Sequence, residues 1–229
     1  MIYLIVTIKS WNLANFRKLR SLDKKNKWVI ISDPKKLTFD WLKKLKPRYV
    51  FFPHWSWIIP KDIWSNFECV VFHMTDLPYG RGGSPLQNLI VRGHSKTKIS
   101  ALRVEEGLDT GDVYMKADLK LAGVAQEIYS RASEIIFTKM IPEIIRKEPK
   151  PIKQKGEVVV FSRRRPEEGS IQNLPNLKTV YDFIRMLDAE GYPKAYLEMD
   201  NGQRLEFSEA KLTKGKITAK VEIYDKSKK

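Results

Sequence analysis

Residues 69–116 read CVVFHMTDLPYGRGGSPLQNLIVRGHSKTKISALRVEEGLDTGDVYMK, and this stretch decides how the chain is expected to fold. An apolar run ends in His73 and leads into a polar loop that carries Pro and Gly. A second strand-like run, residues 99–104, leads into a second loop, residues 105–112. Ligands of open α/β sheets bind beyond the carboxyl ends of the strands. We therefore expect these two loops to form the site.

Strand and helix patterns alternate on both sides of this stretch. The predicted strands are residues 2–8, 27–32, 49–52 and 68–73, and the predicted helices are residues 12–22, 37–45, 63–66, 85–91 and 125–147. Pro142 is expected to kink the last helix. This alternation predicts an α/β fold with a doubly wound, mostly parallel sheet.

The segment KEPKPIKQKG, residues 147–156, is rich in Pro and Lys and has no apolar period, so we place a boundary there. The prediction is a catalytic domain at residues 1–150, and a linker with a small β-rich part at residues 151–229. Within that part, a helix is predicted at residues 177–187, and short strands at 157–161, 195–199, 204–207 and 217–223. The tail YDKSKK, residues 224–229, is expected to fray.

Composition narrows the class of protein. The 229 residues include 42 Lys and Arg against 27 Asp and Glu, a net charge of +15. Such a surplus favours anionic partners, although a lysine-rich solvated surface is an equal alternative. The single cysteine, Cys69, excludes an internal disulfide and a thiolate metal cluster. No apolar run reaches the roughly 18 residues of a membrane span. We expect a cytoplasmic protein without metal or membrane association.

Several common enzyme motifs are absent from the sequence. The loop after the first predicted strand, TIKSWN, lacks the G-x-G-x-x-G that holds a dinucleotide, and no phosphate-binding P-loop occurs. Neither G-x-S-x-G nor H-E-x-x-H is present, which disfavours serine and zinc hydrolysis.

The histidines are the first candidates for chemistry. His54 and His73 each follow an apolar run, whereas His94 lies in a basic turn. His73 is a candidate general base if a carboxylate orients it, and both Asp109 and Asp112 qualify. Either histidine can equally be a half-buried structural residue, and LDTGD an ordinary turn. The glycines at positions 80, 82 and 83 precede a predicted helix. The free N–H groups at the start of that helix could hold an anionic group of a substrate, and the alternative is that the glycines form a plain turn. The residues alone indicate an α/β enzyme with a His/Asp site.

The two loops resemble the folate-dependent formyltransferase family. Its pattern is N-x-H-x-S-L-L-P, then R-G-x-x-P, then L-D-x-G. The matching residues here are His73, Thr75, Leu77, Pro78, Arg81, Gly82, Pro85, Leu108, Asp109, Gly111 and Asp112. FFPHWSWIIPKDIW resembles the family's folate-binding stretch, and FSRRRPEEGSI resembles the start of the C-terminal part in its tRNA and sugar enzymes.

The resemblance implies a Rossmann-like formyltransferase core, N10-formyltetrahydrofolate as formyl donor and an amine as acceptor. His73 would stabilise the tetrahedral oxyanion and assist proton transfer, and Asp109 would set the state of His73. The implied folate-binding residues are Trp57, Ile58, Ile59, Glu105, Glu106, Gly107 and Leu108. The implied substrate-binding residues are Thr75, Arg81, Gly82, Gly83, Gln87, Asn88, Arg163 and Arg164.

One position departs from the family pattern. The asparagine that donates a hydrogen bond to the formyl oxygen is Val71 here. Losing one oxyanion donor typically lowers the rate by about 10²–10³. Gln87, Asn88 and His54 are candidate substitutes.

Three functions follow from the resemblance. The first is formyl transfer to a nucleotide-linked amino sugar, which is favoured by the chain length and the short C-terminal part. The second is methionyl-tRNA formyltransferase, which the charge of +15 favours and the small C-terminal part disfavours. The third is a non-catalytic folate- or sugar-binding homologue, suggested by Val71. The expected partner is the nucleotide sugar, with tRNA second, and a homodimer is left open.

Overall fold

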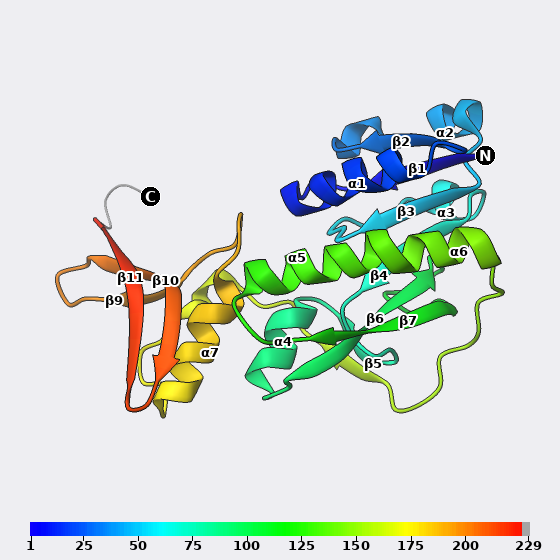
Figure 1. Cartoon of the computed structure of the whole chain (residues 1–229). Coiled ribbons are helices and arrows are strands. Elements are labelled where there is room, and N and C mark those ends of the chain that lie inside the picture. The colour runs from blue at the N-terminus through cyan, green and yellow to red at the C-terminus, as the bar shows by residue number, and fades with distance from the viewer. Residues whose placement is uncertain (226–229) are drawn as a thin grey trace. The chain divides into compact units, whose positions relative to one another are not determined.

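The computed structural model of the protein describes residues 1–225 (Figure 1). Part of the tail expected to fray, residues 226–229, lies outside the described residues. The described elements, with short 3-10 or π-helical turns labelled η, are β1 (Ile2–Val6), α1 (Ser10–Leu22), β2 (Lys27–Ile31), η1 (Pro34–Lys36), α2 (Phe39–Leu45), β3 (Tyr49–Pro53), α3 (Lys61–Trp64), β4 (Cys69–His73), β5 (Tyr79–Gly82), α4 (Pro85–Val91), β6 (Lys96–Arg103), β7 (Val113–Lys120), α5 (Ala125–Ile135), η2 (Ile136–Met140), α6 (Ile141–Lys147), β8 (Val159–Phe161), η3 (Pro166–Gly169), α7 (Leu177–Leu187), β9 (Ala195–Glu198), β10 (Arg204–Thr213) and β11 (Lys216–Tyr224).

The main sheet has six strands in the order β2-β1-β3-β4-β6-β7. Strand β1 pairs in parallel with β2 and β3, and β3 pairs in parallel with β4. A separate three-stranded sheet, β11-β10-β9, is antiparallel. The predicted fold class, a doubly wound and mostly parallel sheet with a small β-rich C-terminal part, is confirmed.

Strand β6 runs antiparallel to β4, with His73 opposite Ser100 and Val70 opposite Arg103. The carboxyl end of β6 therefore lies beside the start of β4, where the Val104 amide donates to the Cys69 carbonyl at 2.9 Å. The two loops therefore leave β4 and β6 at opposite ends of this strand pair. Residues 105–112 must fold back along β4 to approach His73.

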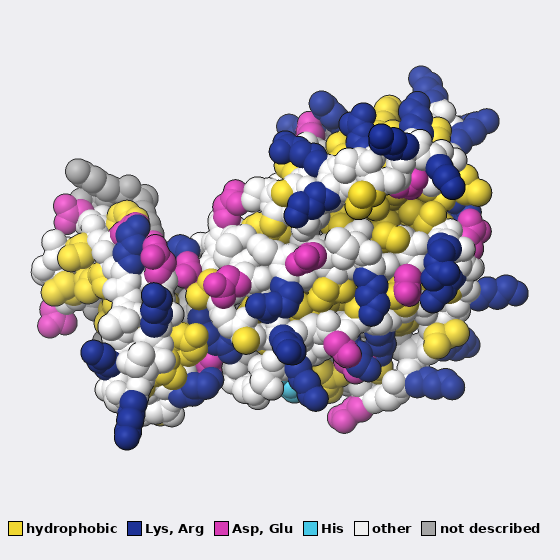
Figure 2. Space-filling view, in the orientation of Figure 1, with side chains coloured by type: hydrophobic (Ala, Val, Ile, Leu, Met, Phe, Trp, Pro, Cys, Tyr) yellow, Lys and Arg dark blue, Asp and Glu magenta, His cyan; other side chains and the backbone are white. Residues whose placement is uncertain are grey.

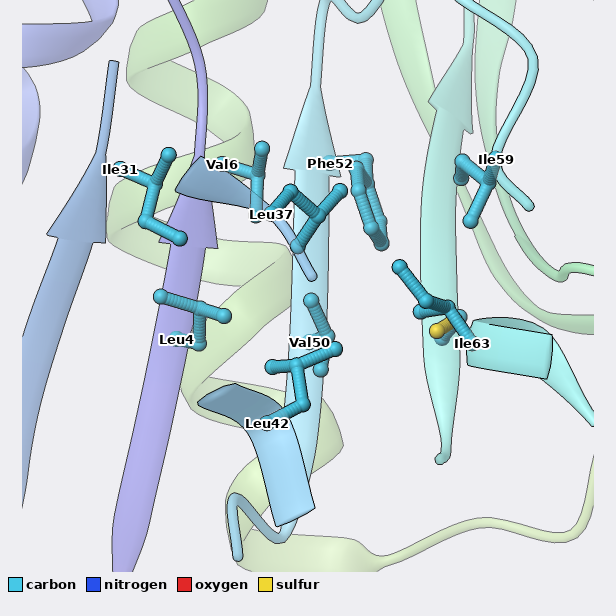
Figure 3. Close-up of a cluster of buried hydrophobic side chains, with 10 residues drawn as sticks. Leu4, Val6, Ile31, Leu37, Leu42, Val50, Phe52, Ile59 and Ile63 are labelled. Atoms are coloured by element: carbon cyan, nitrogen blue, oxygen red, sulfur yellow. The ribbon is translucent and has the colours of Figure 1, made fainter. Parts of the chain in front are cut away.

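The core on one face of the sheet explains why the strands take these places (Figure 3). Leu4 and Val6 of β1 and Val50 and Phe52 of β3 alternate along their strands and pack in one cluster, which also holds Ile63 of α3. Every residue of β3 is buried, as expected for a central strand with both faces covered. Each large side chain buried in this way contributes roughly 1.5–3 kcal/mol.

The long helix predicted at residues 125–147 forms in three pieces. One turn of π-helix, η2, lies between α5 and α6 and ends two residues before Pro142. Proline has no N–H to donate and its ring crowds the preceding turn, so a wider turn beside it is a common way to accommodate it. The structure thus has a π-helical turn beside Pro142, and the predicted kink itself stays a prediction.

The described chain forms two compact units. The first comprises residues 1–82, 97–119 and 129–160, and the second comprises residues 83–96, 120–128 and 161–229. The predicted division into residues 1–150 and 151–229 stays a prediction. Within residues 1–225, no helix is long and apolar enough to cross a lipid bilayer.

The second unit is organised around α7. Asn176 caps this helix by accepting a hydrogen bond from the Thr179 amide at 2.9 Å. The buried Arg185 bonds Asp182 at 2.6 Å and donates to the Leu121 carbonyl at 2.7 Å. A buried guanidinium needs such partners, because an unpaired charge in the interior is costly.

Candidate active site

The loop that follows β4 holds the His73 ring. Nε2 of His73 lies 2.7 Å from the Gly80 carbonyl oxygen, which also accepts a hydrogen bond from Oγ1 of Thr75 at 3.2 Å. Gly80 has φ +79°, a conformation that glycine adopts without steric cost. The predicted substrate-binding residue Thr75 is fully buried and holds the turn together.

Two side chains from neighbouring strands fix the middle of this loop. Oγ of Ser100, on β6, donates to the Thr75 carbonyl at 2.7 Å and accepts from the Leu77 amide at 3.3 Å. Lys116, on β7, donates from Nζ to Asp76 and to the Leu77 carbonyl, each at 2.5 Å. Ser100 and Lys116 therefore anchor residues 75–77 of the loop.

Asp109 comes from the second loop. Its Oδ2 lies 3.5 Å from Nδ1 of His73 and accepts a hydrogen bond from the Gly82 amide at 2.9 Å. Both side chains are largely buried, with exposed fractions of 10% for His73 and 13% for Asp109. Of the two carboxylates that the sequence left open, the structure brings Asp109 to the histidine. The backbone of Asp112 is bound to β6, because its carbonyl accepts a hydrogen bond from the Arg103 amide at 2.9 Å.

This arrangement determines what His73 can do. Each ring nitrogen faces an oxygen acceptor, the Gly80 carbonyl on one side and the Asp109 carboxylate on the other. The neutral ring can donate to only one of them, whereas the doubly protonated ring can donate to both. A shielded imidazole beside a carboxylate suits the uptake and release of a proton.

Val71 lies two residues before His73 and therefore on the same face of β4. It packs against the cluster of Leu77, Leu102 and Val113. An apolar side chain in this cluster offers no hydrogen-bond donor where the family pattern has an amide.

The three candidate substitutes for that amide all have other contacts. Nε2 of Gln87 donates to the Met186 carbonyl at 3.1 Å. Nδ2 of Asn88 faces the carbonyls of Gly83, Ser84 and Ser162 at 2.9–3.1 Å. His54 packs its ring against two aromatic side chains. Each of the three therefore has a structural role where it stands.

His54 follows β3 and lies between Trp11 and Tyr129, with ring centroids 5.4 and 4.5 Å away. Burial of the ring, assisted by the charge of Lys9, lowers the pKa of His54 to about 3. Its backbone is left-handed, with φ +53°, which histidine tolerates better than most residues. His54 is therefore neutral at physiological pH.

The residues expected to hold the folate divide into two kinds. Trp57, Ile58 and Leu108 have exposed fractions of 46%, 93% and 65%, which leaves apolar surface available to a flat ring system. Ile59 is only 6% exposed and belongs to the core cluster of Figure 3. In the loop of residues 105–108, the Glu106 carbonyl accepts from the Thr110 hydroxyl at 2.7 Å.

Five predicted substrate-binding residues belong to the second unit. Gly83 must be glycine, because a Cβ there would lie 2.6 Å from the Arg163 Cα. The Arg164 amide donates to Oγ of Ser84 at 3.0 Å, and its guanidinium donates to the Glu168 carbonyl at 2.9 Å. Arg163 is exposed. Gln87 and Asn88, described above, complete the set.

Sequence reasoning missed Gln154, which lies in the segment treated as a linker. Its Oε1 accepts hydrogen bonds from Nε and Nη2 of Arg81, at 3.1 and 2.8 Å. The Arg81 guanidinium, predicted to bind substrate, therefore already has a partner within the protein. Its Nε2 donates to the carbonyls of Asp109 and Gly111, both at 2.8 Å. Nothing in a basic, proline-rich sequence distinguishes this glutamine from its neighbours.

The chain is similar to known proteins over most of its length. The family model described as "Formyl transferase" matches residues 25–133, and "Methionyl-tRNA formyltransferase, C-terminal domain" matches residues 166–224. A solved structure, methionyl-tRNA formyltransferase from Clostridium thermocellum, is 55% identical with a TM-score of 0.96, covering 98% of this chain and 99% of that one.

More distant relatives match parts of the chain or share its fold. Methionyl-tRNA formyltransferase of Rickettsia felis is 29% identical over 140 residues, which are 58% of this chain and 46% of the relative. The chain thus spans about half the length of the curated relatives it matches. HypX from Aquifex aeolicus in complex with tetrahydrofolic acid shares the fold, with 18% identity and a TM-score of 0.74 over 91% of this chain and 37% of that one.

These findings correct two predictions. Formyl transfer to a nucleotide-linked amino sugar is wrong as the main function, and the nucleotide sugar is wrong as the partner. The argument from chain length failed because the Clostridium thermocellum protein, which matches this chain over 99% of its own length, bears the methionyl-tRNA name. A short C-terminal part therefore does not separate the sugar enzymes from the tRNA enzymes. The structure pairs His73 with Asp109, two family models match the chain, and a relative of the same extent is 55% identical. The chain therefore belongs to the folate-dependent formyltransferase family.

Proposed function

We propose that the protein transfers a formyl group from N10-formyltetrahydrofolate to the amino group of methionyl-tRNA. The observation that carries this proposal is the shielded His73–Asp109 pair, in a chain 55% identical to a methionyl-tRNA formyltransferase of the same extent. A tRNA acceptor places the reaction in the cytoplasm.

The formyl donor supplies an electrophilic carbon when bound, and the exposed Trp57, Ile58 and Leu108 offer apolar surface for its ring system. Nε2 of His73 turns from the Gly80 carbonyl toward the substrate, takes up the proton that the attacking amine loses and returns a proton to the nitrogen that leaves. Asp109 stabilises the charged imidazole between these two steps and holds its orientation. The His73–Asp109 pair therefore accounts for both of these proton transfers.

Val71 sets the expected speed of this reaction. Because Val71 offers no donor, stabilisation of the tetrahedral oxygen falls to the charged His73 ring. Oxyanion-hole donors are typically worth about 10²–10³ in rate, so we expect slower chemistry than at a site with an amide there.

The charge of the chain supports a polyanionic acceptor. Residues 9–48 contain 13 Lys and Arg but only three Asp. Figure 2 shows these cations gathered over the part of the first unit that contains α1, β2 and α2. Binding to an RNA is then expected to weaken steeply as salt rises.

The test incubates the purified protein with methionyl-tRNA and N10-formyltetrahydrofolate and measures formylmethionine by mass spectrometry after deacylation. We expect turnover with methionyl-tRNA, strongly reduced turnover with the variant His73→Asn, and none with unacylated tRNA. Absence of turnover in the parent protein would contradict the proposal. Retained tetrahydrofolate binding in that case would favour the non-catalytic homologue that Val71 suggested.

A further inference from the structure

Gln154 contacts the candidate catalytic aspartate through the backbone rather than through the carboxylate. We propose that Gln154 is a positioning residue, which holds the Asp109 carboxylate against His73 by gripping the main chain of the loop. The proposal rests on the proposed function, in which Asp109 acts on His73. The segment that follows α6 would then help to position a catalytic side chain.

The Gln154 amide uses both of its ends. Its nitrogen donates one hydrogen to the Asp109 carbonyl and the other to the Gly111 carbonyl, both at 2.8 Å. Its oxygen accepts two hydrogen bonds from the Arg81 guanidinium, at 3.1 and 2.8 Å. An arginine has only donors, so Arg81 forces the amide oxygen toward itself and the amide nitrogen toward the Asp109 loop.

The Asp109 loop needs such support. Asp109 has φ +54°, in the left-handed region, which a residue with a side chain adopts only at a steric cost. Two residues later, a Cβ on Gly111 would lie 1.9 Å from the Arg103 carbonyl oxygen, so the backbone passes very close to β6. A strained conformation persists only where the surroundings hold it. The Gly82 amide holds the side chain of Asp109, and Gln154 holds its main chain.

The segment that carries Gln154 is itself fixed on both sides. Ile152 and Val113 exchange two backbone hydrogen bonds, at 2.8 and 3.0 Å. Farther on, the Val159 amide donates to the Pro78 carbonyl at 3.4 Å. Gln154 therefore projects from a segment that is attached to the start of β7 on one side and to Pro78, just before β5, on the other, and it links the Asp109 loop to Arg81 on β5.

The deciding variant is Gln154→Glu. The carboxylate keeps its contact with Arg81 but presents an acceptor to two carbonyl oxygens, so the Asp109 loop must move. Gln154→Leu removes both contacts, and Lys153→Gln changes an exposed neighbour as the matched control. With an active parent, we expect kcat to fall by about ten- to a hundredfold in both Gln154 variants, with KM for methionyl-tRNA changing less than about threefold.

A second measurement does not need activity. The pH titration of the His73 ring, followed by NMR in the absence of substrate, is expected to differ from the parent's in Gln154→Leu, which adds no charge of its own. Lys153→Gln should leave it unchanged. A shifted titration in an inactive parent would overturn the proposed function but not the role of Gln154. A titration and a pH–rate profile that both match the parent's would overturn the role of Gln154.

Discussion

His54 follows β3 and His73 ends β4, and these two strands are parallel neighbours in the six-stranded sheet. The His54 ring lies between the rings of Trp11 and Tyr129, and burial keeps it neutral. The His73 ring lies between the Gly80 carbonyl and the Asp109 carboxylate. The same residue type, at nearly the same point of a strand, therefore has an aromatic environment in one case and two hydrogen-bond acceptors in the other.

The difference comes from segments far away in the sequence. Tyr129 belongs to α5, and Asp109 to the loop that folds back along β4. The residues next to each histidine in the chain do not decide its chemistry. What a histidine after a buried strand can do thus depends on which distant element covers it.

The largest expected effect is a difference in the rate of formyl transfer between variants of the two histidines. His73→Asn should lower kcat by about 10³–10⁴, because it removes the group that carries the proton. His54→Phe keeps an aromatic ring between Trp11 and Tyr129 and should retain formyl transfer within about threefold. Both rates are measured with methionyl-tRNA as the acceptor. An equal loss in the two variants would break the comparison, since it would make His54 part of the chemistry.

The next effect concerns acid stability. The pKa of His54 is lowered to about 3 in the folded protein, against about 6.5 in the unfolded chain. Below pH 6.5 the unfolded state therefore binds a proton that the folded state does not, and stability falls as the pH falls. Between pH 6.5 and 4 this contributes a loss of roughly 2–3 kcal/mol in the free energy of unfolding.

The measurement is urea unfolding of the parent and of His54→Phe across that pH range. The variant lacks the titrating ring, so its free energy of unfolding should depend less steeply on pH by that amount. Comparing slopes removes any difference in stability at neutral pH. Parallel slopes would mean that the His54 ring is not kept neutral.

The smallest expected effect sharpens the description of the His73 side. Val71→Asn restores an amide on the face of β4 that carries His73, and should raise kcat by about ten- to a hundredfold. It also places an amide in an apolar cluster, so we expect a loss of about 1–3 kcal/mol in stability. The control is Val71→Thr, which is close to valine in shape but has no amide. A rate unchanged in both variants would show that the oxyanion does not form beside position 71.

Much of the fold could be predicted because its signals are local. The β-branched runs and helical spacing predict β1, α1, β2, α2, β3 and β4 in order, and α4 and α7 with their observed bounds. The motif spacing indicates His73 and Asp109, and the structure places these two side chains together. Their catalytic roles stay predictions.

What could not be predicted depends on contacts across long stretches of sequence. The direction of β6 is set by its pairing with β4, which no pattern within residues 96–103 reveals. The choice of Asp109 over Asp112 follows from a loop that doubles back, and Gln154 lies in a segment with no periodicity. The prediction of the substrate class was wrong for another reason. Chain length does not indicate which acceptor a formyltransferase uses.

The position of Gln154 matters for dissecting this protein. A fragment that stops at residue 150 would include His73 and Asp109 but would lack the side chain that joins the Asp109 loop to Arg81. Chimeras of related enzymes joined at residue 150 would therefore replace Gln154 while keeping the loop that it contacts. A junction after Val160, where the first compact unit ends, would keep Gln154 together with Asp109 and Arg81.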